Sequence, residues 1–201
     1  MLPNPPADVP PDPAPSTPSH MAALSGAALA AIVAALAMLG PFSIDAYLPA
    51  FPNIEASLHA SEIEVQQSLS IYMLAFAVMV LWHGALSDAF GRRNLVIGSL
   101  LLFAIGTLGC AGSHSIHYLL AFRTLQGVSA GAGVVIGRAI IRDLYAGAPA
   151  ARLLSLVTMI FAIGPAIAPI LGGWIVKLSD WRTIFLALFV YTVALAWYCY
   201  K

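Results

Sequence analysis

Charged residues are scarce in this sequence. Asp, Glu, Lys and Arg make up 9% of its 201 residues, whereas a soluble domain usually carries about 25%. Nine basic and nine acidic residues give a formal net charge of zero, so the chain has no general electrostatic attraction for nucleic acids. So few charges cannot keep the surface of a 21.1 kDa globule in water. This composition excludes a soluble enzyme and a nucleic-acid-binding protein.

Cysteine is equally rare. The two cysteines, Cys110 and Cys199, both lie in apolar stretches, and neither has the neighbouring Cys or His that a zinc site requires. A disulfide scaffold and a metal centre are therefore not expected. Each thiol is interpreted as a small apolar side chain that fills space between helices.

Apolar residues, by contrast, are abundant. They make up 60% of the chain, and the mean hydropathy is +0.88. A membrane-spanning helix needs about 20 mostly apolar residues, and such runs cover 21–48, 65–86, 94–112, 116–137, 153–176 and 183–200. Because an unpaired backbone cannot lie in lipid, we predict an all-α membrane protein with six transmembrane helices.

The first twenty residues differ from the rest. Segment 1–20 holds eight of the fourteen prolines and no Lys or Arg. This composition predicts a disordered, proline-rich tail, and the segment lacks the basic region of a signal peptide. Met21 is an alternative start, which the sequence leaves open. The expected organisation is a tail over 1–20 and a six-helix bundle over 21–201.

The basic residues predict the orientation of these helices. Loops that contact the cytoplasm are enriched in Lys and Arg. Lys177 and Arg182 fall on one side of the membrane, and six basic residues fall on the other. The six are Arg92, Arg93, Arg138, Arg142, Arg152 and Lys201. Both termini are therefore expected in the cytoplasm, with the protein crossing the inner membrane several times.

A polar segment bounded by glycines, 84–93, follows the second apolar run. It has the pattern G-x-L-S-D-x-x-G-R-R. Gly84 is expected to permit close helix approach and Gly91 a tight turn, while Arg92 and Arg93 remain among the lipid headgroups. Taken alone, the segment is interpreted as an ordinary cytoplasmic turn.

Together with two further motifs, this segment resembles the major facilitator superfamily of transporters. The fourth run contains R-x-x-Q-G at 123–127, and the fifth contains Gly-Pro-Ala-Ile-Ala-Pro-Ile-Leu-Gly-Gly at 164–173. The segment 164–173 is similar to the G-P-x-x-G-G element of the superfamily's antiporters, with an additional Ala-Pro step. Ala89 replaces the usual basic residue of the first motif, and Ile160 replaces an expected glycine. Segments 43–52, 142–145 and 181–182 are similar to the bicyclomycin and chloramphenicol resistance branch.

The resemblance implies the N-terminal half of a transporter that exports drug-like molecules in exchange for protons, without a cofactor. It assigns a conformational-gating role to Gly84, Asp88, Gly91, Arg92 and Arg93. It assigns the antiporter helix to Gly164, Pro165, Pro169, Gly172 and Gly173. The small residues at every fourth position also suit close helix packing alone.

Two opposite charges lie inside the apolar runs. Arg123 is in the interior of the fourth run, where a charge costs at least about 2.5 kcal/mol and usually has a function. Asp45 lies near the end of the first run, at a similar depth. We expect Asp45 to titrate, with Arg123 and Gln126 stabilising its charged form, in a substrate cavity that includes Tyr47. The alternatives are that Asp45 caps its helix and that Arg123 forms a static ion pair.

Two other functions remain to be compared. Gly127-Val-Ser129-Ala-Gly131 resembles the serine motif of an intramembrane protease, but none of the five histidines falls in the sixth run to serve as its base. This motif is better interpreted as small-residue packing, and the chain as no enzyme. The second alternative follows from the missing second half of the transporter. We expect a truncated chain, while a homodimer, a separate partner half and a fragment without transport activity stay open.

Overall fold

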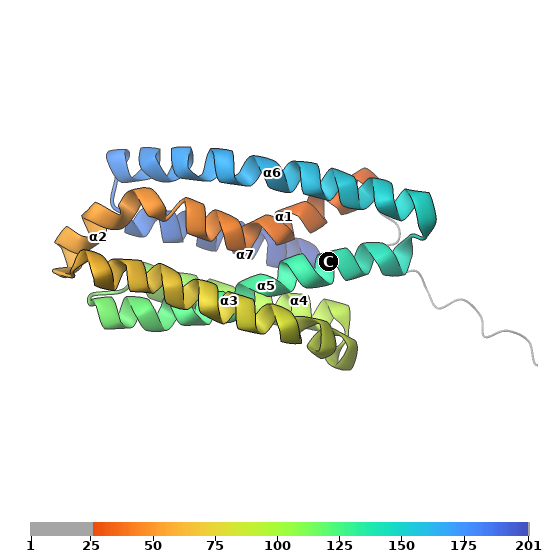
Figure 1. The fold of residues 1–201 in the computed structure, drawn as a ribbon, viewed down its shortest axis with the longest axis horizontal. Coiled ribbons are helices and arrows are strands. Elements are labelled where there is room, and N and C mark those ends of the chain that lie inside the picture. Colours follow the sequence, from red (N-terminus) through yellow and green to blue (C-terminus); the bar gives the residue numbers. More distant parts are fainter. Residues whose placement is uncertain (1–25, 201) are drawn as a thin grey trace, which may run out of the picture.

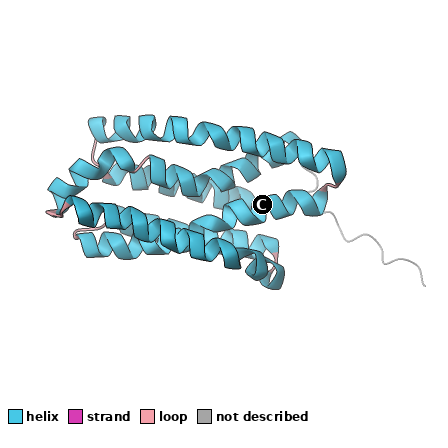
Figure 2. Ribbon diagram, viewed as in Figure 1, coloured by secondary structure: helices cyan, strands magenta, loops and turns pink. Residues whose placement is uncertain are grey.

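The computed structural model describes residues 26–200, and these residues are almost entirely helical (Figure 2). The predicted tail over 1–20 lies outside the described residues. The helices are α1 (Gly26–Asp45), the short 3-10 helix η2 (Leu48–Ala50), α2 (Phe51–Leu58), α3 (Glu62–Phe90), α4 (Arg92–Ala111), α5 (Ile116–Leu144), α6 (Gly147–Leu178) and α7 (Arg182–Tyr200). Within this range six helical segments are long and apolar enough to cross a membrane, the first combining α1, η2 and α2. The six predicted spans are confirmed.

Three helices extend beyond their predicted apolar runs. The 29 residues of α3 and of α5 rise about 44 Å at about 1.5 Å per residue, which exceeds the roughly 30 Å of a bilayer's hydrocarbon core. The 32-residue α6 is longer still. Asp88 of α3 and Arg138 of α5 lie beyond the predicted apolar runs, and both are exposed.

The six long helices lie side by side along the long axis of the molecule (Figure 1). α5 packs mainly against α3 and α4, and α4 also packs against α7. α1 packs against α6 and α5, and it has a smaller contact with α7. α1 therefore joins α6 to the other helices of the bundle.

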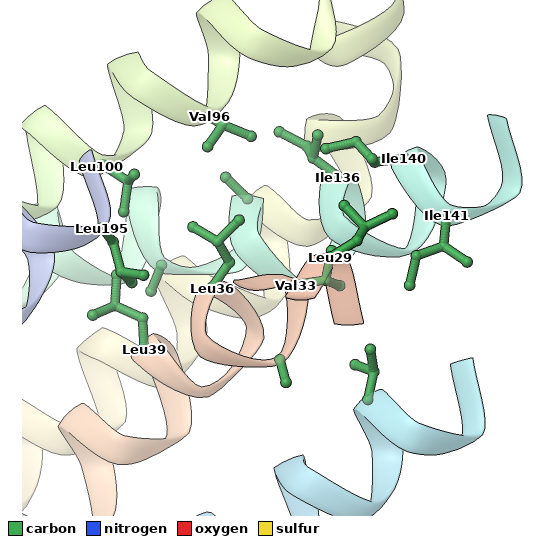
Figure 3. Close-up of a cluster of buried hydrophobic side chains, with 14 of the residues drawn as sticks. Leu29, Val33, Leu36, Leu39, Val96, Leu100, Ile136, Ile140, Ile141 and Leu195 are labelled. Atoms are coloured by element: carbon green, nitrogen blue, oxygen red, sulfur yellow. The ribbon is translucent and has the colours of Figure 1, made fainter. Parts of the chain in front are cut away.

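Two apolar clusters stabilise the bundle, one towards each end. The first joins α1, α4, α5 and α7, as Figure 3 shows for Leu36, Val96, Ile136 and Leu195. The second surrounds Tyr47 and includes residues of α5, α6 and α7. Tyr72 belongs to the first cluster and Tyr47 to the second, and the candidate site lies where both rings contact Arg123.

Glycines allow α5 to approach its neighbours closely. A Cβ atom on Gly127 would overlap the carbonyl oxygen of Tyr72, and one on Gly133 would overlap the carbonyl oxygen of Leu36. A Cβ on Gly131 would lie 2.6 Å from a methyl group of Val80. The interpretation of 127–131 as small-residue packing is confirmed.

The two ends of the bundle differ in charge. We call the end where α3 and α5 finish and α4 and α6 begin the arginine-rich end. Its basic residues are Arg92, Arg93, Arg138, Arg142 and Arg152. The opposite end carries four carboxylates in and beside α2, α3 and the α6–α7 turn, namely Glu55, Glu62, Glu64 and Asp180.

Candidate functional site

Arg123 is the centre of a buried polar cluster between α1 and α5. Its side chain is fully enclosed, with 0% exposure. Its Nη1 atom donates to Ser43 Oγ and to Gln126 Oε1, both at 3.0 Å. The R-x-x-Q spacing places Arg123 and Gln126 one helical turn apart, and this explains their contact.

Two tyrosine rings flank the guanidinium of Arg123. Its Cζ atom lies 4.5 Å from the ring centre of Tyr47 and 4.2 Å from that of Tyr72. Tyr47 follows the end of α1 and Tyr72 belongs to α3, so the arginine links three helices. Such cation–π contacts stabilise a desolvated cation by about 2 kcal/mol.

Hydrogen bonds hold the cluster in place. Gln126 Nε2 donates to Thr107 Oγ1 of α4 at 2.7 Å, and the Tyr47 hydroxyl shares a 2.7 Å hydrogen bond with Ser68 of α3. The Tyr72 hydroxyl donates to the carbonyl of Gly40 at 3.0 Å. Gln126, Tyr47 and Tyr72 are thus each oriented by a helix other than their own.

The positive charge of Arg123 has no carboxylate partner among the described residues. The ion pairs within 26–200 involve Arg92 and Arg182. Asp45, at the end of α1, is half-buried and forms no ion pair with Arg123, so the predicted juxtaposition of the two charges is absent from this structure. The Nε and Nη2 groups of Arg123 are buried without a hydrogen-bond partner. Arg123, Gln126 and Tyr47 are brought together, and Asp45 is not.

The segment 84–93 forms less of a loop than expected. α3 continues through Asp88, and Gly91 alone, at φ 86°, turns the chain into α4. A side chain strongly disfavours this φ. Arg92 pairs with Asp88 at 3.0 Å and with Asp143 of α5 at 3.1 Å. This three-residue charge cluster ties together the ends of three helices.

Gly84 does not have its expected role. A Cβ atom there would meet only Val135, at 4.0 Å, which is an ordinary contact. Close approach of helices therefore does not require a glycine at this position.

The glycines of α6 divide between two faces. Gly164 and Gly172 are buried, and a Cβ on Gly172 would overlap the carbonyl oxygen of Ala46 just after α1. Gly173 is half-buried, and Pro165 is exposed. Pro169 is half-buried, and α6 continues as one helix through both prolines. One small-residue stripe therefore packs against α1, as lipid-embedded helices require.

The hydroxyl of Ser129 is occupied by its own helix. It donates to the carbonyl of Leu125 at 3.1 Å and of Gln126 at 3.0 Å. A serine nucleophile needs a neighbouring base instead. Within residues 26–200, no three or more His, Cys, Asp or Glu side chains gather in a way that could hold a metal ion.

Several members of the cluster escaped sequence analysis. Ser43, Ser68 and Thr107 are buried polar residues that contact it. For Ser68 and Thr107 the only signal was polarity within apolar runs, whereas Ser43 begins the segment 43–52 that resembles the resistance branch. Tyr72 belongs to no motif, and only its aromatic ring suggested a place in the cavity wall.

Comparison with known proteins identifies relatives of this chain. The sequence profile described as Major Facilitator Superfamily matches residues 21–201. A Bacillus subtilis protein named "Uncharacterized MFS-type transporter YdgK" is 43% identical over 165 residues, which are 81% of this chain and 41% of the relative. The "Bicyclomycin resistance protein homolog" of Haemophilus influenzae is 35% identical over 75% of this chain and 38% of its own length. The "Multidrug resistance protein MdtL" of Escherichia coli is 36% identical over 80% of this chain and 41% of its own length. The chain thus spans about two fifths of these relatives.

Solved structures share the fold at low sequence identity. The human organic anion transporter MFSD10 has a TM-score of 0.69 at 18% identity, over 88% of this chain and 47% of that one. A bacterial homologue of the human lysosomal transporter Spinster, in an inward-facing conformation, has a TM-score of 0.72 at 17% identity. It matches 87% of this chain and 42% of its own. The expected half of a transporter fold is confirmed.

Proposed function

This chain belongs to the Major Facilitator Superfamily, and on that premise we propose that it exports drug-like small molecules across the inner membrane in exchange for protons. Relatives with names that refer to bicyclomycin and multidrug resistance support the substrate class. We place the arginine-rich end and both termini in the cytoplasm, in agreement with the positive-inside rule.

The observation that carries this proposal is the enclosed charge of Arg123. A buried cation without a carboxylate partner is costly in a membrane protein and usually serves transport. Its Nε and Nη2 groups have no hydrogen-bond partner, so they can donate to an anionic or polar group of the substrate when the site opens. In this proposal, the substrate and the charged form of Asp45 compete for electrostatic interaction with the guanidinium of Arg123.

A short segment of α1 and its extension links the two charges. Ser43 and Tyr47 both contact Arg123, and Asp45 lies between them in the chain. A proton that binds Asp45 changes the charge on the segment that holds the guanidinium. Proton uptake on one side of the membrane and release on the other are thereby coupled to the shape of the site.

Two other elements complete the proposed cycle. The charge cluster of Asp88, Arg92 and Asp143 ties helices at the arginine-rich end and opens when the site faces the cytoplasm. The glycines of α6 provide a smooth surface on which α1 shifts. The second wall of the substrate path comes from a second set of six helices, because this chain spans about two fifths of its relatives.

Substitution of Asp45 tests the coupling. In energised bacteria that produce this chain and lack other exporters, we expect efflux of a fluorescent cationic dye, and loss of that efflux in Asp45→Asn. The uncharged amide keeps the size of the side chain but cannot carry a proton. The readout is the rate at which cell fluorescence falls, together with the amount of chain in the membrane.

Glu55→Gln is the matched control, since Glu55 is another half-buried carboxylate near the same end of the bundle. We expect it to retain efflux. Equal efflux in Asp45→Asn and the unsubstituted chain would remove Asp45 from the mechanism. Absence of efflux from the unsubstituted chain would favour a fragment that inserts but does not transport.

A further inference from the structure

A cavity of about 280 Å³ opens at the arginine-rich end, away from the Arg123 cluster. Leu36 of α1, Val96 of α4 and Ile140 of α5 line its buried, apolar part (Figure 3). Arg92 and Arg93 belong to its lining and are more exposed, so they form the rim. Asp143, the ion-pair partner of Arg92, also belongs to the lining, so the cavity has an apolar floor and a charged rim.

The two arginines of the rim differ in their partners. Arg92 is neutralised by Asp88 and Asp143. Arg93 donates to the carbonyl of Tyr200 and lies over its ring, 5.6 Å from the centroid. Among the described residues, no carboxylate lies within 4.0 Å of Arg93, so Arg93 is the arginine of the rim without an ion pair.

The surroundings of the rim add to this charge. The same end carries three further arginines, Arg138, Arg142 and Arg152, which have no ion pair in the described part of the chain. The first turn of α4 contains no acidic residue, and its N-cap is a glycine. Five arginines and two carboxylates, Asp88 and Asp143, lie at this end of the described chain, so an anion above the cavity would meet a net positive charge.

We propose that this cavity is a binding site for an anionic phospholipid. The phosphate group lies against Arg93 at the rim, and the start of one acyl chain enters the space between Leu36, Val96 and Ile140. Basic pockets between transmembrane helices bind anionic headgroups in this way. The site would stabilise the contact of α1, α4 and α5 and is independent of transport.

The size of the cavity argues against a drug as its occupant. Sites for drug-sized molecules usually measure about 300–1,000 Å³ and bury most of the ligand. At about 280 Å³, this cavity lies just below that range. A chain that is only partly inserted fits it better than a compact molecule.

Native mass spectrometry of the purified 201-residue chain tests the proposal. The chain is mixed with phosphatidylglycerol or phosphatidylcholine of identical acyl chains, and bound lipid is counted as added mass. We expect retained phosphatidylglycerol to exceed phosphatidylcholine, and Arg93→Gln to lower this preference about fivefold, the effect of one arginine near an anionic surface.

Two further variants separate the parts of the site. Arg138→Gln removes the same charge outside the cavity and should lower the preference less than Arg93→Gln does. Val96→Trp fills the floor while Arg93 remains, and it should lower retention of the lipid. Equal effects of Arg93→Gln and Arg138→Gln, or undiminished binding in Arg93→Gln, would overturn the proposal, whether or not Val96→Trp folds. Displacement of the lipid by excess inorganic phosphate would overturn it in favour of a site for free anions.

Discussion

Arg123 illustrates how single residues set the chemistry of this protein. A charge at the centre of a membrane helix costs at least about 2.5 kcal/mol. Contacts with Tyr47 and Tyr72 and hydrogen bonds to Ser43 and Gln126 offset this cost. The Nε and Nη2 atoms of Arg123 are buried without a hydrogen-bond partner, and this part of the cost is not offset. Arg123 is thus fixed in position but keeps hydrogen-bond donors that are free for a ligand.

Replacement of Arg123 tests whether this residue serves transport or the stability of the fold. We expect Arg123→Gln to abolish dye efflux and to change the free energy of unfolding by less than about 1 kcal/mol, because lost contacts are offset by the removal of an unpaired buried charge. Thermal unfolding in detergent measures the second quantity, with Arg142→Gln as an exposed control. A loss of about 3 kcal/mol or more, typical of a broken buried ion pair, would instead show that Arg123 locks the fold.

Sequence reasoning located this residue but not all of its neighbours. The R-x-x-Q motif placed Arg123 and Gln126 in one site, and their spacing of three residues on one helix face explains the contact between them. Depth in the membrane followed from about 1.5 Å per residue, and it suggested that Asp45 lies opposite Arg123. Depth does not give the rotation of one helix relative to another. That rotation directs Ser43, and not Asp45, towards the guanidinium.

At the scale of helices, the positions of glycine decide which contacts are close. Gly172 lies against the backbone of Ala46, and Gly133 lies against that of Leu36. Gly84 and Gly98 have no such neighbour, although all four are helical. The sequence predicted the α6 stripe from its four-residue spacing, but the same argument was wrong for Gly84. Only the packing of the partner helix distinguishes these glycines.

A methyl group added at Gly172 and one added at Gly98 should have opposite effects on the stability of the bundle. Gly172→Ala should destabilise the bundle by about 1–3 kcal/mol, since the new Cβ overlaps a carbonyl oxygen and forces α1 and α6 apart. Gly98→Ala has open space around it and should stabilise α4 by up to about 1 kcal/mol. Thermal unfolding of both variants in the same detergent provides the comparison. Equal stability of the two would contradict the packing described for α6.

At the scale of the whole molecule, apolar runs predicted the number of helices but not their lengths or neighbours. The six spans are present, and they extend into polar ends that hydropathy alone does not delimit. α3 and α6 expose large apolar side chains such as Leu74, Leu81, Met159 and Trp174. In a membrane these faces contact lipid or, in the function proposed above, a second set of six helices. Pairwise packing of helices depends on three-dimensional contacts that no local pattern records.

Exchange of substrate for protons, as proposed above, can be measured as a change in the internal pH of membrane vesicles. Inside-out membrane vesicles that contain this chain are acidified by respiration, and the internal pH is followed with a fluorescent amine. We expect that addition of a transported dye releases protons from the vesicles, and that Asp45→Asn vesicles release none. An unchanged pH gradient on addition of a dye that the unsubstituted chain demonstrably exports would contradict proton antiport.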